Sequence, residues 1–128
     1  MNKNLENDQN LISSLVEHTK DIAQNYLNEI DQRSPATTYV PKQNLGLSLT
    51  GIGAEKTLDL FMERYGNHTP ASNGPRFWGL VTGGTTPASL LGDWLTSVYD
   101  LNLSHAGNSP APDIETEAIS MLRELFGL

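Results

Sequence analysis

The spacing of apolar residues predicts a long amphipathic helix at the start of the chain, over about residues 7–32. Apolar side chains recur there at steps of three, four and seven, which places them on one stripe of a helix. We expect Asp8 to cap this helix or to favour its dipole, and Ser34-Pro35 to end it, because a residue before proline avoids helical geometry. The stripe contains Leu11, Ile12, Leu15, Val16, Ile22, Ala23, Tyr26, Leu27 and Ile30.

Three further helices are expected downstream. One covers about residues 53–65 and is stopped by Gly66, since glycine commonly ends helices. Another follows Gly83-Gly84, with Thr86 as its N-cap and Pro87 as its first helical residue. The last opens at Ser109 or Asp113 and runs towards the end of the chain.

The segments between these helices are long and contain little β structure. Residues 35–49 form a Pro-containing connection with a short extended patch at 37–40, and residues 67–74 form a polar loop. The aromatic and β-branched run that begins at Phe77 is expected to be short and extended. A second long loop covers residues 102–112. The fold class is therefore mostly α, with about four amphipathic helices joined by long loops.

Four amphipathic helices with little β structure do not readily close a single core. We therefore expect the isolated chain to expose apolar surface unless it dimerises or docks on another body. The length of 128 residues suits one small domain.

Composition narrows the classes of partner and compartment. The net charge is −7 with only eight Lys and Arg, which disfavours binding to nucleic acid or to an anionic membrane surface. The chain has no cysteine, so disulfides and thiolate chemistry are excluded. No signal peptide and no apolar run of about 20 residues are visible, and a cytoplasmic protein is expected.

The turn at Gly83-Gly84-Thr85-Thr86-Pro87 has two interpretations. Glycines and hydroxyls at a helix N-terminus suit an anion, because free N–H groups point outwards there. The same residues also make an ordinary turn with a threonine cap. Pro87 removes one donor and no Walker-type lysine follows, so the sequence favours the capped turn over a phosphate cradle.

Titratable residues give no candidate catalytic or metal site. His18 and His68 are expected at the surface, and no histidine pair has metal-ligand spacing. Glu115 and Glu117 diverge on one helix and are more suited to its N-terminus. A Schiff-base lysine needs a desolvated pocket, whereas all four lysines fall on polar faces or loops: Lys3, Lys20, Lys42 and Lys56.

The run from Arg76 to Leu95, RFWGLVTGGTTPASLLGDWL, resembles the N-terminal signature of the group II pyridoxal-dependent decarboxylases. This family acts on aromatic amino acids, glutamate, tyrosine and diaminobutyrate. The later run SPAPDIETE, which begins at Ser109, resembles the Ser-Pro-Ala segment that leads into the family's next helix. The resemblance is strong over residues 75–128 and only architectural over residues 1–74.

This resemblance implies the N-terminal wrapping segment of a fold-type I enzyme that uses pyridoxal 5'-phosphate and works as a homodimer. Residues 1–74 would wrap the other subunit, and residues 75–128 would supply loops and helices to the substrate pocket. By position in the motif, Leu80, Val81, Thr82 and Gly83 would border the amino-acid substrate. In the second loop, Leu103, Ser104 and His105 would approach the pocket of the facing subunit.

The chain departs from the family at two places. Aromatic-amino-acid decarboxylases carry Tyr-Phe-Pro-Thr in place of the run that starts at Leu80, and a histidine in place of Gly74, so an aromatic substrate is not implied. Leu128 falls where the large α/β cofactor domain of the family should begin. The Schiff-base lysine and its partners lie in that domain, so the resemblance implies no catalytic or cofactor-binding residue in this chain.

Two functions therefore remain open. One is a part of an amino-acid decarboxylase, a carboxy-lyase, that gives dimer surface and pocket loops but is catalytically incomplete alone. The other is a non-catalytic helical interaction module. A small anion-binding protein that uses the glycine turn is a third and weaker hypothesis.

Overall fold

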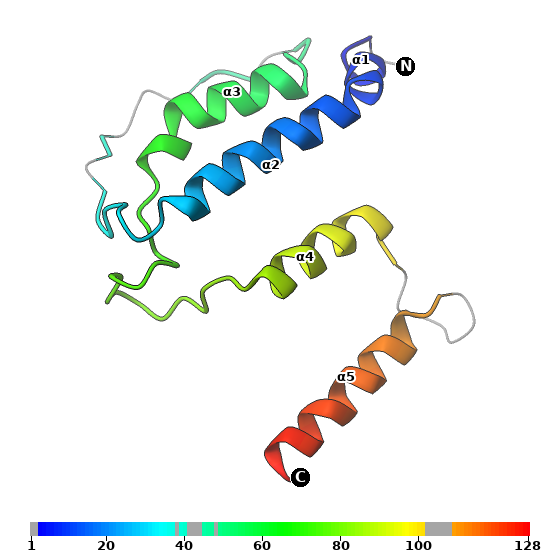
Figure 1. The fold of residues 1–128 in the computed structure, drawn as a ribbon. Helices are drawn as coiled ribbons and strands as arrows, with labels where there is room; N and C mark the ends of the chain where they lie inside the picture. Colours follow the sequence, from blue (N-terminus) through cyan, green and yellow to red (C-terminus); the bar gives the residue numbers. More distant parts are fainter. Residues whose placement is uncertain (1–2, 38, 41–44, 48, 102–108) are drawn as a thin grey trace. The chain divides into compact units, whose positions relative to one another are not determined.

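The structure is a computed structural model that describes residues 3–37, 39–40, 45–47, 49–101 and 109–128. Over these residues it is mostly helical and has no strand (Figure 1), which confirms the fold class. The helices are α1 (Lys3–Asn10), α2 (Ile12–Asn28), α3 (Ala54–Arg64), the short 3₁₀ helix η1 (Gly66–His68), α4 (Pro87–Tyr99) and α5 (Ala111–Phe126).

The chain divides into two compact units, Met1–Gly84 and Thr85–Leu128. The first contains α1, α2, α3 and η1, and the second contains α4 and α5. The sequence-based boundary between residues 74 and 75 divides dimer wrapping from pocket lining and does not mark the boundary between compact units. This division of roles stays a prediction.

The long first helix is broken into two, which the periodicity did not predict. Leu11 separates α1 from α2 with φ −97° and ψ 4°, outside regular helical values. The Ser14 hydroxyl donates to the Leu11 carbonyl at 2.8 Å. The prediction that Asp8 caps its own helix is also wrong. This residue lies inside α1, and its carboxylate accepts the Ala54 N–H at the start of α3 instead of capping its own helix.

The second part of the first helix ends earlier than its apolar stripe. Helix α2 stops at Asn28 rather than near Gln32, and Glu29 is its C-cap. The chain then continues in turns, with the Arg33 N–H donating to the Glu29 carbonyl at 3.0 Å. After these turns the Thr37 hydroxyl donates to the His68 carbonyl of η1 at 2.6 Å.

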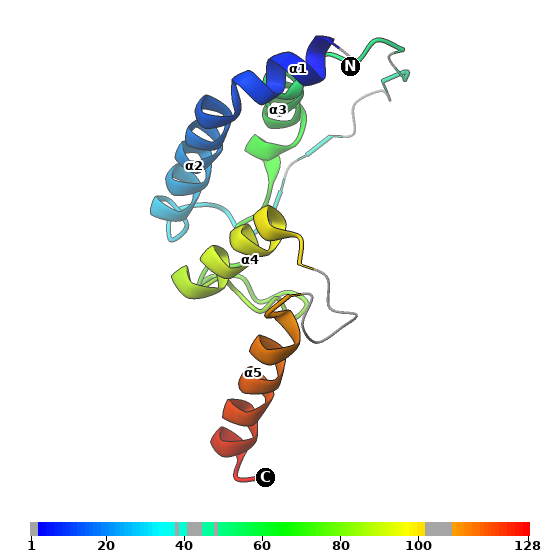
Figure 2. The same cartoon turned by 90° about the vertical axis from the view of Figure 1, so that its right-hand side faces the viewer.

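Helix α3 runs alongside α2 in the same direction in Figures 1 and 2. It ends at Arg64, close to the predicted end, but Gly66 does not terminate it as expected. Gly66 instead begins η1, without a positive φ. A Cβ there would lie 2.4 Å from the Met62 sulfur, so a larger residue at this position would push the flexible Met62 side chain aside.

The N-terminus of α4 has the predicted cap. Thr86 Oγ1 accepts the Ser89 N–H at 3.2 Å, and Ser89 Oγ accepts the Thr86 N–H at 3.0 Å. Pro87 is the first helical residue. This reciprocal pair is a capping box, and it occupies N–H groups that an anion would need. The hydrogen bonds therefore favour the capped turn over an anion site.

The last helix begins between the two residues proposed for its start. Pro110 is the N-cap position of α5, and Ala111 is the first helical residue. Ser109 Oγ accepts the Ala111 N–H at 3.3 Å, while Asp113 lies in the first turn. Both polar residues therefore support this helix end, one by a hydrogen bond and one by its charge near the positive end of the helix dipole.

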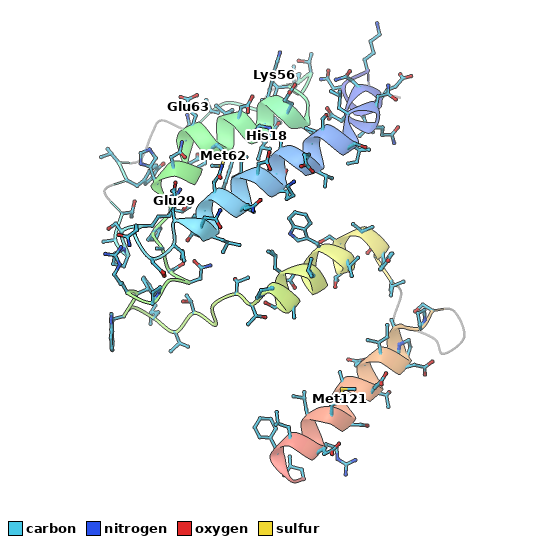
Figure 3. All side chains as sticks on the ribbon, viewed as in Figure 1. His18, Glu29, Lys56, Met62, Glu63 and Met121 are labelled. Carbon is cyan, nitrogen blue, oxygen red and sulfur yellow. The ribbon has the colours of Figure 1, made fainter. Side chains whose placement is uncertain are left out.

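Large apolar side chains of the described residues are mostly exposed. The buried apolar residues are both alanines, Ala71 at 2% and Ala111 at 6% exposure, and no large side chain is fully buried. Figure 3 shows one of these exposed side chains, Met121, on α5. The expected exposure of apolar surface is thus observed. None of the described helices is both long and apolar enough to cross a membrane.

Candidate functional site

An open hollow of about 390 Å³ lies in the loop that precedes the second unit. It is formed by residues 72–74 and 77–84 of the first unit. All four residues of this loop that were predicted to border a substrate line the hollow: Leu80, Val81, Thr82 and Gly83. The structure therefore brings this group together, and their role as substrate contacts stays a prediction.

The rim of this hollow is fully open to solvent. Trp78, Leu80 and Val81 are 94%, 91% and 100% exposed. The run is not a continuous extended segment either, because it bends at Gly79 and Leu80. Exposed apolar side chains of this size bind a small molecule well only after another surface covers them, since a ligand pocket buries most of its ligand.

Two local interactions shape the hollow. Thr82 Oγ1 donates to the Ser72 carbonyl at 2.5 Å, which ties the far side of the loop to its beginning. The Phe77 ring lies so close to Gly79 that an added Cβ would meet its Cζ at 2.4 Å. Thr82 is therefore held by a backbone acceptor, and Gly79 permits the ring to fold over the chain.

The loop is anchored on the C-terminal end of α2. The Tyr26 hydroxyl lies 3.0 Å from Asn73 Oδ1 and 3.2 Å from the Pro70 carbonyl. Gly74 packs against Ile30, because a Cβ at Gly74 would lie 3.1 Å from Ile30 Cγ1 and 3.2 Å from two carbonyl oxygens. A side chain at position 74 would therefore crowd Ile30 and the backbone around it.

Two arginines complete the anchor. Arg76 Nη2 donates to the Arg33 carbonyl at 2.5 Å. The Arg33 guanidinium lies 4.9 Å from the centre of the Tyr26 ring and 3.2 Å from Glu29 Oε2, whereas its Nε is buried without a hydrogen-bond partner. Neither role was predicted from the sequence. The signal available was a tyrosine on an apolar stripe, whose hydroxyl needs a polar partner.

The predicted contribution of the second loop lies outside the described residues. Leu103, Ser104 and His105 all fall within residues 102–108, for which no placement is described. Their approach to the pocket of a facing subunit stays a prediction.

The histidines and lysines that are described lie at the surface. His18 and His68 are exposed, as expected, and the His68 ring lies 5.7 Å from that of Tyr39. Lys3 and Lys56 are exposed as well, whereas Lys42 lies outside the described residues.

Lys20 has an electrostatic environment unlike that of a Schiff-base lysine. It is paired with Glu17, and this hydrogen bond raises the Lys20 pKa above the ordinary value of 10.5. A nucleophilic lysine needs the opposite shift, because only the neutral amine attacks a carbonyl. The raised pKa of Lys20 therefore favours its protonated form.

Acidic residues do not gather into a metal site in the part of the chain that the structure covers. No group of three or more His, Asp or Glu side chains there is arranged to hold a metal ion. Glu115 and Glu117 are exposed near the start of α5.

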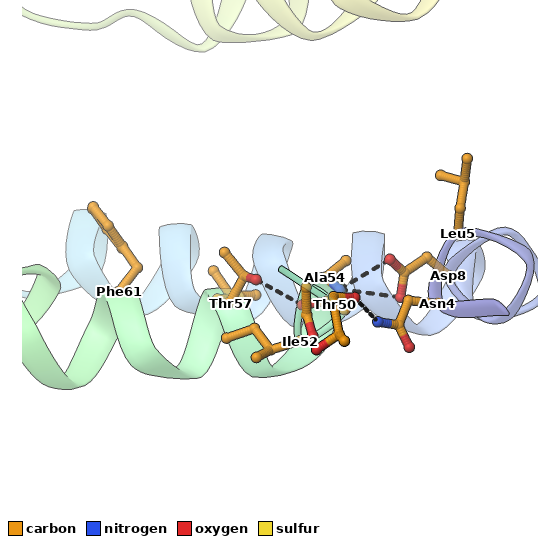
Figure 4. Close-up of a pocket in the computed structure, with 11 residues that line it drawn as sticks. Asn4, Leu5, Asp8, Thr50, Ile52, Ala54, Thr57 and Phe61 are labelled. Carbon is orange, nitrogen blue, oxygen red and sulfur yellow. Dashed lines mark hydrogen bonds between the residues drawn. The ribbon is translucent and has the colours of Figure 1, made fainter. Parts of the chain in front are cut away.

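A larger open hollow, of about 760 Å³, lies between α1, the loop at residues 50–53 and α3 (Figure 4). Its apolar lining includes Leu5, Ile52 and Phe61. Its polar groups are engaged: Asn4 Nδ2 donates to the Thr50 carbonyl at 3.0 Å, and Asp8 accepts the Ala54 N–H. These hydrogen bonds hold the walls together, so the hollow is a joint between α1 and α3 rather than a site with available polar groups.

Comparisons with known proteins leave the resemblance without independent support. No protein-family model matches the sequence, and the searches of curated proteins and of solved structures gave no match.

Proposed function

We propose that the chain is the N-terminal part of a pyridoxal-phosphate-dependent amino-acid decarboxylase of group II. It contributes dimerisation surface and substrate-pocket loops, and it depends on another domain for the cofactor lysine. The carrying observation is that Leu80, Val81, Thr82 and Gly83, inside the run that resembles the family signature, surround one hollow.

Two further features support this proposal. The loop that forms the hollow is held by the Tyr26–Asn73 hydrogen bond and packs closely at Gly74, while the hollow itself is open, as expected of half a pocket that another body completes. The chemistry of such an enzyme belongs to pyridoxal 5'-phosphate, which accepts the electrons released by decarboxylation. The described lysines, Lys3, Lys20 and Lys56, do not lie in a desolvated pocket, and the other domain would bind the cofactor.

The test combines spectroscopy with complementation. The pure chain mixed with pyridoxal phosphate should show no aldimine absorbance. Co-expression with a group II decarboxylase that lacks its own N-terminal segment should restore dimers and carbon dioxide release. Stoichiometric cofactor binding with turnover by the chain alone, or failure to assemble with the truncated enzyme, would contradict the proposal.

A matched pair of variants separates pocket lining from assembly. Val81→Ala changes a residue of the hollow, whereas Val40→Ala changes an exposed valine outside it. Both variants should assemble with the truncated enzyme. Only Val81→Ala should change the KM for the amino acid, because it alone alters the pocket wall.

The alternative is a non-catalytic helical interaction module. The nearly absent core and the many exposed apolar side chains favour this function. It predicts that Thr82→Ala leaves partner binding intact, because the hollow would then have no ligand. Loss of partner binding in this variant, with helicity unchanged, would count against the module.

A further inference from the structure

The second unit contains an apolar groove between its two helices. Its volume is about 470 Å³, and it lies between the C-terminal half of α4 and the N-terminal half of α5. The apolar part of the lining consists of Leu95, Tyr99, Leu101, Ala111, Ile114 and Ala118. Tyr99 is 62% and Ile114 is 57% exposed, so the walls of this groove are accessible to solvent when no partner is bound.

The charged side chains of the second unit are mostly acidic. The second unit has six acidic side chains and a single basic one, Arg123. Glu115 lines the groove itself, and Asp100 lies between the groove residues Tyr99 and Leu101. The C-terminus of α4, which bears the negative end of its helix dipole, is next to the same side chains.

A partner would contact side chains of the second unit rather than pair with its backbone. No strand edge is present among its described residues, so a partner has no β-sheet to extend. A groove between two helices instead accepts the apolar face of a third helix.

We propose that this groove binds a basic amphipathic helix of a partner protein. Leucine-like side chains of the partner helix fill the groove, and flanking lysines or arginines face Glu115 and Asp100. A second copy of the same unit is a poorer occupant, because it would bring six more acidic side chains to an acidic rim. The inference rests on the groove and its charges, and it holds whichever proposed function is correct.

The test uses the full chain and two synthetic labelled peptides of ~18 residues with leucines at helical spacing. One peptide has lysine at the remaining positions and the other has glutamate. Fluorescence anisotropy should show binding of the lysine peptide that weakens with salt, and affinity about tenfold lower or worse for the glutamate peptide. Equal affinity for both peptides, or no binding of either, would overturn the proposal.

Matched variants on α5 test the location. Ile114→Ser should lower the affinity about tenfold, whereas Ile119→Ser, at a similarly exposed isoleucine outside the groove lining, should leave it nearly unchanged. Glu115→Gln should likewise weaken binding and its salt dependence more than Glu124→Gln. Equal effects within each pair would indicate non-specific attraction and overturn the proposal.

Two further measurements check for other occupants. Sedimentation should show that two copies of the chain do not dimerise through this groove. A dimer that is abolished by Ile114→Ser but not by Ile119→Ser would overturn the proposal, because a second copy would then occupy the groove. NMR of the free chain should give no contacts from Tyr99 or Ile114 to residues of the first unit. Such contacts would mean that the groove is already occupied.

Discussion

Asp8 in α1 caps helix α3, because both oxygens of its carboxylate lie 3.0 Å from the backbone nitrogen of Ala54. The N-cap residue of α3 is Gly53, which has no side chain to accept this N–H. The carboxylate of another helix therefore does the work of an N-cap and also meets the positive end of the α3 dipole. This single contact joins segments that are far apart in the sequence.

Removal of this contact should destabilise the first unit. Asp8→Ala is expected to cost about 1 kcal/mol, the usual loss when a helix N-cap is deleted. Asp8→Asn should cost less, because its amide oxygen still accepts the hydrogen bond. Urea unfolding followed by circular dichroism measures both, with Glu6→Ala on the same exposed helix as the control. Equal effects of Asp8→Ala and Glu6→Ala would show that the cap contributes nothing.

The hydroxyl of Tyr26 should hold the loop beneath the candidate site. Tyr26→Phe removes its hydrogen bond at Asn73 and Pro70 and should cost about 1 kcal/mol. Amide hydrogen exchange at Gly74 should accelerate, since its N–H bonds to the Ala71 carbonyl within this loop. Tyr99→Phe, in the other unit, is the control. Unchanged exchange at Gly74 would mean that the loop is held by other contacts.

Two glycines of the same loop should respond in opposite ways to alanine. Gly74→Ala places a methyl group against Ile30 and two backbone carbonyls, which have little freedom to move, and should destabilise the first unit by about 1–3 kcal/mol. Gly83→Ala has open space and no positive φ, so it should be neutral or stabilise by up to about 1 kcal/mol. Thermal unfolding distinguishes them. Equal midpoints would contradict the packing at Gly74.

The pKa of Lys20 should fall when its partner loses its charge. Glu17→Gln removes the interaction that contributes most to the raised pKa, so the value should return towards 10.5. Asp21→Asn should lower the pKa less, because its carboxylate is 3.6 Å away and contributes less. NMR titration of the Lys20 side chain measures both shifts. A larger shift in Asp21→Asn would reverse the assignment.

The same shift fixes the sign of a pH effect. A lysine whose pKa is raised on folding stabilises the fold while it is protonated in both states. This contribution is present below about pH 10.5 and disappears as the pH rises through the higher pKa of the folded chain. Because the pair is exposed, the effect is small and screened by salt.

The positions of the helices could be predicted because their signals are local. Apolar periodicity placed α3, α4 and α5 to within a few residues, and Thr86 with Pro87 located the start of α4. A capping box needs only residues that are three apart in sequence, so a single chain segment contains the whole signal.

The errors arose where distant residues decide the local structure. Asp8 was expected to act on its own helix. Nothing in the neighbouring sequence indicates that Asp8 lies close to the start of α3, where the N-cap residue Gly53 has no side chain to accept the Ala54 N–H. The error at Gly66 was local instead, because this glycine has no positive φ and begins η1 rather than forming a left-handed helix end.

The candidate site was predictable only in part. The motif identified Leu80 and its neighbours, which do line one hollow. The anchors of that hollow, Tyr26 and Arg33, were not found, because hydrogen bonds across more than forty residues leave no periodic signal.

Under the proposed function, Val81 faces the substrate of a decarboxylase assembled with this chain. The chain has no cysteine, so Val81→Cys gives it a single thiol whose alkylation can be followed by mass spectrometry. In the complex with the truncated decarboxylase, the amino-acid substrate should slow alkylation at this position. It should leave Val98→Cys, at an exposed site on α4, unaffected. Equal alkylation of Val81→Cys with and without substrate would contradict the account.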